Sequence, residues 1–153
     1  MFKRLGFVLL AMVFMGSVVA DAKMNIKEKK KFKQWEKFLV SSDSWIPTMN
    51  KSCGTKITFH VKEVMVKPYM KANRSGTYFC DGIASTMNSM CKSDSDNIVK
   101  PEIAKIKKVV CTTDVSKPKG KAYKLEKGVL TATVGVEASN TDRAFKEWIE
   151  NNL

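Results

Sequence analysis

The chain has 153 residues, with 27 Lys and Arg against 15 Asp and Glu, so its formal net charge at pH 7 is +12. Only three of the 27 basic residues are arginines. Arginine is the residue that reads base edges and grips phosphates bidentately, so this composition argues against sequence-specific recognition of nucleic acid. It allows loose attraction to polyanions such as lipid headgroups and anionic glycans.

Residues 1–20 have the three parts of a secretory signal peptide. A positively charged start is followed by an apolar run over residues 5–15 and then by small residues. The apolar run is shorter than the ~20 residues that cross a bilayer. We therefore expect cleavage after Ala20 or Ala22, export to the periplasm of a bacterium or to the medium, and a single small exported domain over residues 23–153.

The first predicted element of the domain is an amphipathic helix over residues 24–40. Phe32, Trp35 and Leu39 recur at helical spacing, and lysines line the opposite face. A helix with a basic face and an aromatic face can lie on a membrane surface. We favour instead the docking of its aromatic face on the core. The lysines that could contact an anionic surface are Lys27, Lys29, Lys30, Lys31 and Lys33.

A second, short helix is predicted through Trp45 and Met49, with Asp43 as its N-cap and Gly54 as its C-terminal cap, which places Cys53 at the end of the helix. A strand follows over residues 56–61, in which the apolar side chains alternate on one face. His60 points to the opposite face of this strand. It is the only histidine of the chain, and we expect a partly exposed strand residue rather than a catalytic group.

The middle of the chain is predicted to contain one long helix. Residues 66–73 include Pro68 and are predicted as a loop. The helix over residues 75–92 then carries one buried stripe, made of Cys80, Ile83, Met87, Met90 and Cys91. The methionines on or near this stripe could suggest a soft-metal site. Methionine is a common filler of irregular core gaps, so we expect packing.

A polar link over residues 94–100 leads to a short helix that contains Pro101 in its first turn. Strands are predicted over residues 106–113, 122–126 and 129–136, and Asn140 or Thr141 is predicted to cap a last helix. Three consecutive strands with short turns predict an antiparallel meander, which the first strand joins across the helical connection. The predicted fold class is α+β: an antiparallel sheet of about four strands with the helices packed on one face.

The four cysteines predict two disulfides, because their number is even and the chain is exported. Cys80 and Cys91 lie on one helix, eleven residues or ~16 Å apart, whereas a disulfide allows only ~7 Å between Cα atoms. A helix antiparallel to its flanking strands would bring Cys53 to Cys91 and Cys111 to Cys80. We prefer Cys53–Cys91 with Cys80–Cys111, and keep Cys53–Cys80 with Cys91–Cys111 as the second possibility.

The sequence predicts no catalytic, cofactor or metal site. It has a single histidine, no C-x-x-C motif, and cysteine spacings that do not suit zinc. Asp94 and Asp96 stand in a polar link that lacks the Gly and the later Glu of a calcium loop. The two carboxylates of a glycosidase can lie far apart in sequence, so a carboxylate site without a motif stays open.

Three functions follow, in this order. The first is a non-catalytic, disulfide-stabilised binding or structural module outside the cytoplasm, with no enzyme activity and no cofactor. The second is a cationic protein of the envelope or membrane surface that uses the Lys-rich first helix. The third is a small hydrolase with an unrecognised carboxylate site. The expected partner is an anionic surface of lipid headgroups or glycans, bound weakly and through charge, and no sequence-specific nucleic-acid binding is expected.

Overall fold

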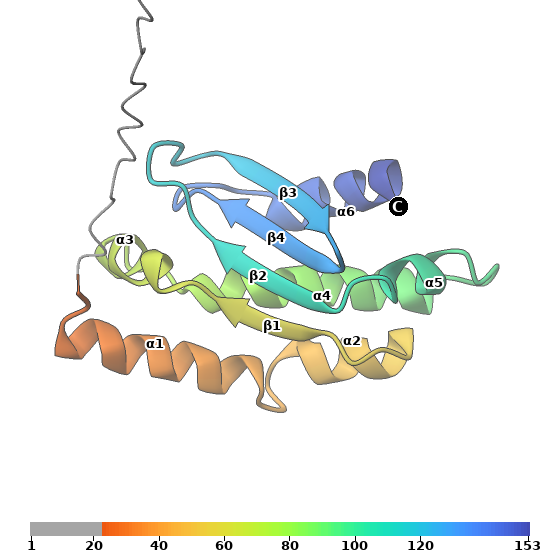
Figure 1. Cartoon of the computed structure of the whole chain (residues 1–153), viewed down its shortest axis with the longest axis horizontal. Coiled ribbons are helices and arrows are strands. Elements are labelled where there is room, and N and C mark those ends of the chain that lie inside the picture. Colours follow the sequence, from red (N-terminus) through yellow and green to blue (C-terminus); the bar gives the residue numbers. More distant parts are fainter. Residues whose placement is uncertain (1–22) are drawn as a thin grey trace, which may run out of the picture.

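The computed structural model describes residues 23–153, so the predicted signal peptide and both cleavage positions lie outside the described residues. No helix in this part of the chain has the length and apolar character needed to cross a membrane. The elements, in chain order, are α1 (Ile26–Leu39), α2 (Trp45–Cys53), β1 (Thr58–Val61), the 3-10 helix η1 (Glu63–Met65), α3 (Val66–Lys71), α4 (Gly76–Lys92), α5 (Val99–Ile103), β2 (Lys108–Thr112), β3 (Lys121–Glu126), β4 (Val129–Val134) and α6 (Thr141–Asn152) (Figure 1).

The four strands form one mixed sheet in the order β1–β2–β4–β3. β1 pairs with β2 and β2 pairs with β4 in parallel, and only the β3–β4 hairpin is antiparallel. The α+β class and the four strands are confirmed. The prediction of an antiparallel sheet built on a meander was wrong, because β4 lies between β2 and β3 and separates two strands that follow each other in the chain.

The connection from β2 to β3 explains this order. It crosses the end of β4, where the Gly135 N–H donates to the Gly120 carbonyl at 2.8 Å and the Glu137 N–H donates to the Pro118 carbonyl at 2.7 Å. A Cβ atom on Gly135 would collide with the backbone of Lys117 and Pro118. The missing side chain therefore lets the connection pass over β4 and places β3 at the edge of the sheet.

The strands have two different faces. Val109, Cys111, Leu130 and Ala132 alternate along β2 and β4 on one face and are 0% exposed. α4 and α6 lie behind the sheet in the view of Figure 1, while α1 and α2 run along its β1 side. α4 contacts β1 and β2, and α6 contacts β3. That the helices as a group pack on one face stays a prediction.

α1 begins and docks as its sequence indicates. The Asn25 side chain accepts from the Glu28 N–H at 2.9 Å, and the Glu28 carboxylate accepts from the Asn25 N–H at 2.8 Å, which forms a capping box. Trp35 and Leu39 are only 3% and 2% exposed. The aromatic face of α1 is therefore part of the hydrophobic core, as favoured above.

Two local predictions were wrong. Residues 66–73 are not a loop, since α3 occupies most of them and holds Pro68 in its first turn, where a proline leaves no hydrogen bond unmade. The N-cap of α2 is Ser44 rather than Asp43: the Ser44 hydroxyl accepts from the Ile46 N–H at 3.1 Å. The predicted C-terminal cap of α2 is confirmed, because Gly54 has a left-handed backbone with φ 66°.

Candidate functional site

Both disulfides join α4 to its neighbours. Cys53 at the end of α2 is bonded to Cys91, and Cys80 is bonded to Cys111 of β2, with Cα–Cα distances of 5.2 and 6.0 Å. The preferred connectivity is confirmed, and the alternative pairing was wrong. All four cysteines are buried. Disulfides are rare in the reducing cytoplasm, so these two indicate an oxidising environment outside it.

The five lysines predicted to contact an anionic surface lie together on α1. Lys31 is partly exposed, and the other four, Lys27, Lys29, Lys30 and Lys33, are exposed. None of them takes part in the four salt bridges that occur within residues 23–153. These ammonium groups are therefore free of carboxylate partners within the described residues, whereas Trp35 and Leu39 on the opposite side of α1 are buried in the core.

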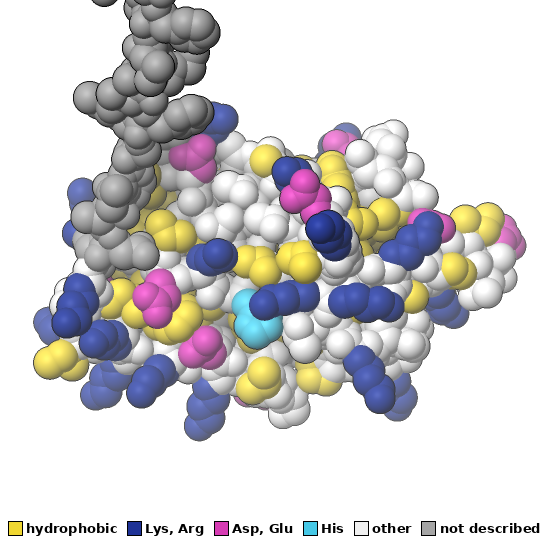
Figure 2. Space-filling model, in the orientation of Figure 1, with side chains coloured by type: hydrophobic (Ala, Val, Ile, Leu, Met, Phe, Trp, Pro, Cys, Tyr) yellow, Lys and Arg dark blue, Asp and Glu magenta, His cyan; other side chains and the backbone are white. Residues whose placement is uncertain are grey.

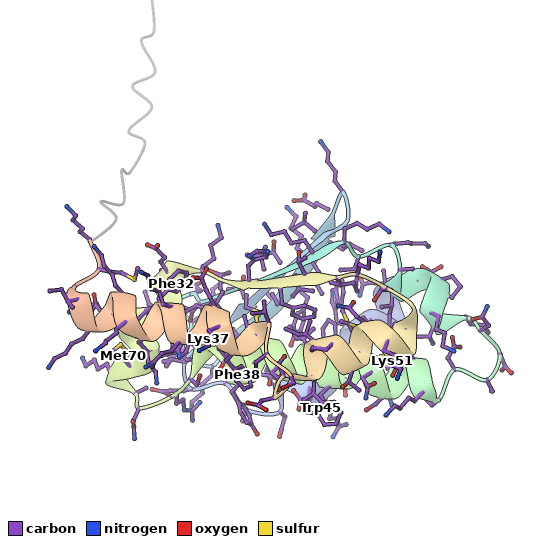
Figure 3. All side chains as sticks on the ribbon, turned by 90° about the horizontal axis from the view of Figure 1, so that it is seen from below. Phe32, Lys37, Phe38, Trp45, Lys51 and Met70 are labelled. Carbon is purple, nitrogen blue, oxygen red and sulfur yellow. A yellow bond between two sulfur atoms is a disulfide. The ribbon has the colours of Figure 1, made fainter. Side chains whose placement is uncertain are left out.

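The basic side of α1 continues onto α2. Figure 3 views the molecule from this side and places Lys37 on α1 and Lys51 on α2, with Trp45 between them. Trp45 is 44% exposed, and Ile26 at the start of α1 is 84% exposed. Lysines surrounding single apolar side chains are suited to loose contact with a charged surface.

A second basic surface covers the sheet and was not predicted. It consists of the strand residues that alternate with the buried ones, and we call it the open face. All of its residues are exposed or partly exposed. Its members are Thr58 and His60 of β1, Lys108, Val110 and Thr112 of β2, Ala122, Lys124 and Glu126 of β3, and Val129, Thr131 and Thr133 of β4.

Figure 2 looks onto this side of the molecule and shows the single histidine, in cyan, among lysines and small apolar patches. The strand register places His60, Val110, Thr131 and Lys124 in one row across all four strands. His60 is the only aromatic ring on the open face, and no arginine lies on it. Its side chains therefore offer mainly hydroxyl groups and ammonium groups.

The charge of His60 depends on its neighbours. Partial desolvation and the nearby Lys108 ammonium group lower the pKa of His60 below its ordinary value of 6.5, and the Glu36 carboxylate opposes this shift. The neutral form of His60 therefore predominates at pH 7. It adds a positive charge to the open face only in acidic conditions.

A hollow of about 510 Å³ lies at the carboxyl end of β4, where α4 and α6 begin. Arg74, Tyr78 and Asp142 line it, and the Arg74 guanidinium donates to the Val136 carbonyl at 2.6 Å. Burial raises the pKa of Tyr69, which also lines the hollow, to about 12. The lining can hydrogen-bond a small polar molecule. It contains one carboxylate, whereas glycoside hydrolysis uses two.

Asp94 has a structural role. Its carboxylate accepts hydrogen bonds from the backbone N–H groups of Ile98, Val99 and Lys100, at 2.8, 3.1 and 2.9 Å. Desolvation raises the pKa of Asp94, but these three donors outweigh it and lower that pKa below its usual value. Asp94 therefore stays ionised and fixes the entry to α5. Residues 23–153 contain no group of three or more His, Cys, Asp or Glu that could hold a metal.

Sequence reasoning missed the open face and the hollow for different reasons. The open-face threonines alternate visibly in residues 129–134, but their meeting with Thr112 depends on a parallel pairing that the sequence did not indicate. The hollow depends on the packing of α6 against α4, where a Cβ atom on Gly82 would collide with Asp142.

Comparisons of the chain with protein-family models, curated proteins and solved structures find no match.

Proposed function

We propose that this protein is an exported, non-catalytic, disulfide-stabilised module that binds an anionic partner in the periplasm or the medium. The observation that carries the proposal is the large surplus of lysines outside ion pairs on a frame held by two buried disulfides. The four salt bridges within residues 23–153 engage only three lysines and one arginine. Export removes Lys3 and Arg4, which leaves 25 basic side chains against 15 acidic ones after cleavage at Ala20, or 14 acidic ones after cleavage at Ala22.

The arrangement of the polar groups supports binding over catalysis. His60, the one imidazole available as a general base, lies on the open face and does not line the hollow that holds Arg74 and Asp142. The hydroxyls of that hollow therefore lack the histidine that activates a serine in a triad. A hydrolase with a carboxylate site ranks third, because Asp94 is occupied by three backbone donors.

Export and oxidation are tested together. Protein recovered from outside the cytoplasm should begin at Asp21 or Lys23 in an intact-mass measurement, and alkylation without reductant should label no cysteine. A product that retains residues 1–14 would contradict export with cleavage. Labelling of two or more cysteines would contradict the disulfide framework.

Binding is tested by sedimentation of the mature protein with anionic vesicles and with acidic polysaccharides at two salt concentrations. The Debye length falls from ~30 Å at 0.01 M salt to ~8 Å at 0.15 M, so attachment through charge should weaken steeply over this range. Absence of binding to every polyanion at 0.01 M salt would overturn the proposal. Uncharged dextran is the control for adsorption that does not involve charge.

A second candidate function is peripheral attachment to anionic membranes through α1. It is favoured by the unpaired lysines of α1 beside the exposed side chain of Ile26. Because Trp35 and Leu39 remain buried, attachment would be shallow. Replacement of Lys29, Lys30, Lys31 and Lys33 by Gln should then weaken binding to vesicles while the fold stays intact. Unchanged vesicle binding in this variant would exclude α1 as the attachment site.

A further inference from the structure

We propose that the open face is the binding surface and that its partner is an acidic polysaccharide, a chain that carries carboxylate or sulfate groups along hydroxyl-bearing sugars. This inference rests on the proposed function, which names an anionic partner but assigns no surface and no chemical class to it. Three features of the open face support it: charge, free hydroxyl groups, and the absence of aromatic and arginine platforms.

The charge of the open face is positive. Lys108 and Lys124 lie on it, and Lys62 extends it, because the Lys62 N–H continues the β1–β2 ladder by donating to the Cys111 carbonyl at 2.8 Å. The single acid is Glu126, whose carboxylate lies 2.8 Å from the Lys124 ammonium group. Their side chains are 66% and 70% exposed. Such an exposed pair contributes little stability, so a polyanion can compete for Lys124.

The hydroxyl groups form a regular pattern. Thr58, Thr112, Thr131 and Thr133 make no side-chain hydrogen bond to any residue of the described chain. Thr112 and Thr133 face each other across the β2–β4 pair, and Thr131 is the next residue of β4 on the same face. Neighbouring strands lie ~4.8 Å apart, and residues two apart on a strand lie ~7 Å apart. Each hydroxyl can both donate and accept, as sugar hydroxyls do.

The open face does not suit single-stranded nucleic acid. Proteins that bind single strands stack the bases on aromatic rings or guanidinium planes. His60 is the only ring on this face, and both arginines of the described chain, Arg74 and Arg143, lie outside the strands. Lysine is a point charge that needs no planar partner, so it can pair with carboxylates and sulfates spaced along a sugar chain.

A membrane is also a poor match. Interfacial binding places large projecting apolar side chains below the headgroups. The apolar members of the open face, Val110, Ala122 and Val129, are short side chains within strands. A hydrated chain with charges and hydroxyls along its length matches both kinds of polar group on this face. The structure therefore favours a polysaccharide over the other two polyanions.

The inference is tested with the mature protein and polygalacturonate as the probe. The face variant carries Lys62→Gln, Lys108→Gln and Lys124→Gln. The matched control carries Lys29→Gln, Lys30→Gln and Lys33→Gln on α1, which removes the same total charge. The face variant should raise the Kd about tenfold, since three direct contacts are lost. The control should raise it by less than about threefold, because it removes only distant, screened charge.

A second variant tests the hydroxyl groups. Thr131→Val with Thr133→Val keeps the shape and the strand preference of both residues but removes two hydroxyls. It should raise the Kd about fivefold, and by the same factor at 0.01 M and 0.15 M salt, because lost hydrogen bonds are not screened as exposed charges are. Thermal unfolding of each variant should match that of the parent protein.

Each outcome decides the question. If the α1 control weakens polygalacturonate binding as much as the face variant, the assigned surface is wrong and the proposed function stands. If single-stranded DNA or anionic vesicles bind more tightly than polygalacturonate and depend on the face lysines, the assigned partner class is wrong. If no polyanion binds at 0.01 M salt, this inference and the proposed function both fall.

Discussion

The two faces of the sheet belong to the same strands but serve different purposes. On the inner face Val109, Cys111 and Leu130 are completely buried. Protein interiors are close-packed, so a side chain of another size at these positions would leave a cavity or a clash. On the open face, residues such as Thr131 remain partly exposed, and the Thr131 hydroxyl makes no hydrogen bond to another residue of the described chain. Strand alternation therefore separates stability from surface chemistry, and substitutions at neighbouring positions on one strand should lower the free energy of unfolding by very different amounts.

The largest effect should come from the disulfide that ties the inner face to α4. Replacing Cys80 and Cys111 by Ala opens a bridge that spans 31 residues. The loop-entropy model predicts that the free energy of unfolding falls by about 4 kcal/mol. Urea unfolding measures this loss, and the variant lacking Cys53 and Cys91, which spans 38 residues, should behave similarly. A loss below ~1 kcal/mol would show that the inner face does not depend on this bridge.

A pair of adjacent substitutions tests the contrast directly. Leu130→Ala should lower the free energy of unfolding by about 3 kcal/mol, because Leu130 is 0% exposed and its removal leaves a cavity. Thr131→Ala, one residue further along β4, should cost about 1 kcal/mol or less, which reflects strand preference alone. Denaturant unfolding of both variants gives the comparison. Equal losses would mean that something in the domain packs over the open face.

The close contact between α4 and α1 gives the next largest change in the free energy of unfolding. A Cβ atom on Gly76, at the start of α4, would lie 2.7 Å from the Trp35 ring. Trp35 is buried and cannot move freely, so Gly76→Ala should lower the free energy of unfolding by about 2 kcal/mol despite the better helix preference of alanine. Ser89→Ala, at an exposed position of α4, serves as the control and should change stability by less than ~0.5 kcal/mol.

The smallest effect concerns pH and the open face. The lowered pKa of His60 means that the unfolded chain takes up a proton before the folded protein does. The contribution of His60 to stability is therefore present above about pH 6.5 and is lost as pH falls through its folded pKa. Since His60 is largely exposed, the loss should be slight and absent in His60→Gln. Over the same range polygalacturonate binding should strengthen in the parent protein more than in His60→Gln, which a titration at pH 7 and pH 5 would measure.

The elements and the disulfides could be predicted, but the neighbours of each strand could not. Helical spacing identified α1 and α4, and the length of α4 alone excluded a bond between Cys80 and Cys91. Alternation identifies the face on which a residue lies, but it does not identify the strand beside it. The order of the sheet depends on Gly135, whose lack of a side chain allows the crossing connection, and a single glycine at a strand end has many other uses.

Of the two candidate surfaces, the sequence predicted the lysines of α1 but not the open face. The lysines of α1 were visible because they are consecutive in sequence and share one helix. The open face was not, because Thr112 meets Thr133 only through a parallel pairing between segments about twenty residues apart. Pro68 shows another limit of local rules: the residues around it were predicted as a loop, but Pro68 lies in the first turn of α3, where a proline is tolerated.

The position of β3 at the edge of the sheet also concerns how copies of the protein meet. An edge strand exposes unpaired backbone groups that can pair with the edge of another molecule, and such contacts begin aggregation. Lys121 and Lys124 lie on β3, with Lys119 before it and Lys127 after it, and all four are exposed. Two such edges carry the same charge and repel each other. The surplus of lysines at this edge therefore opposes strand pairing between two copies of the chain.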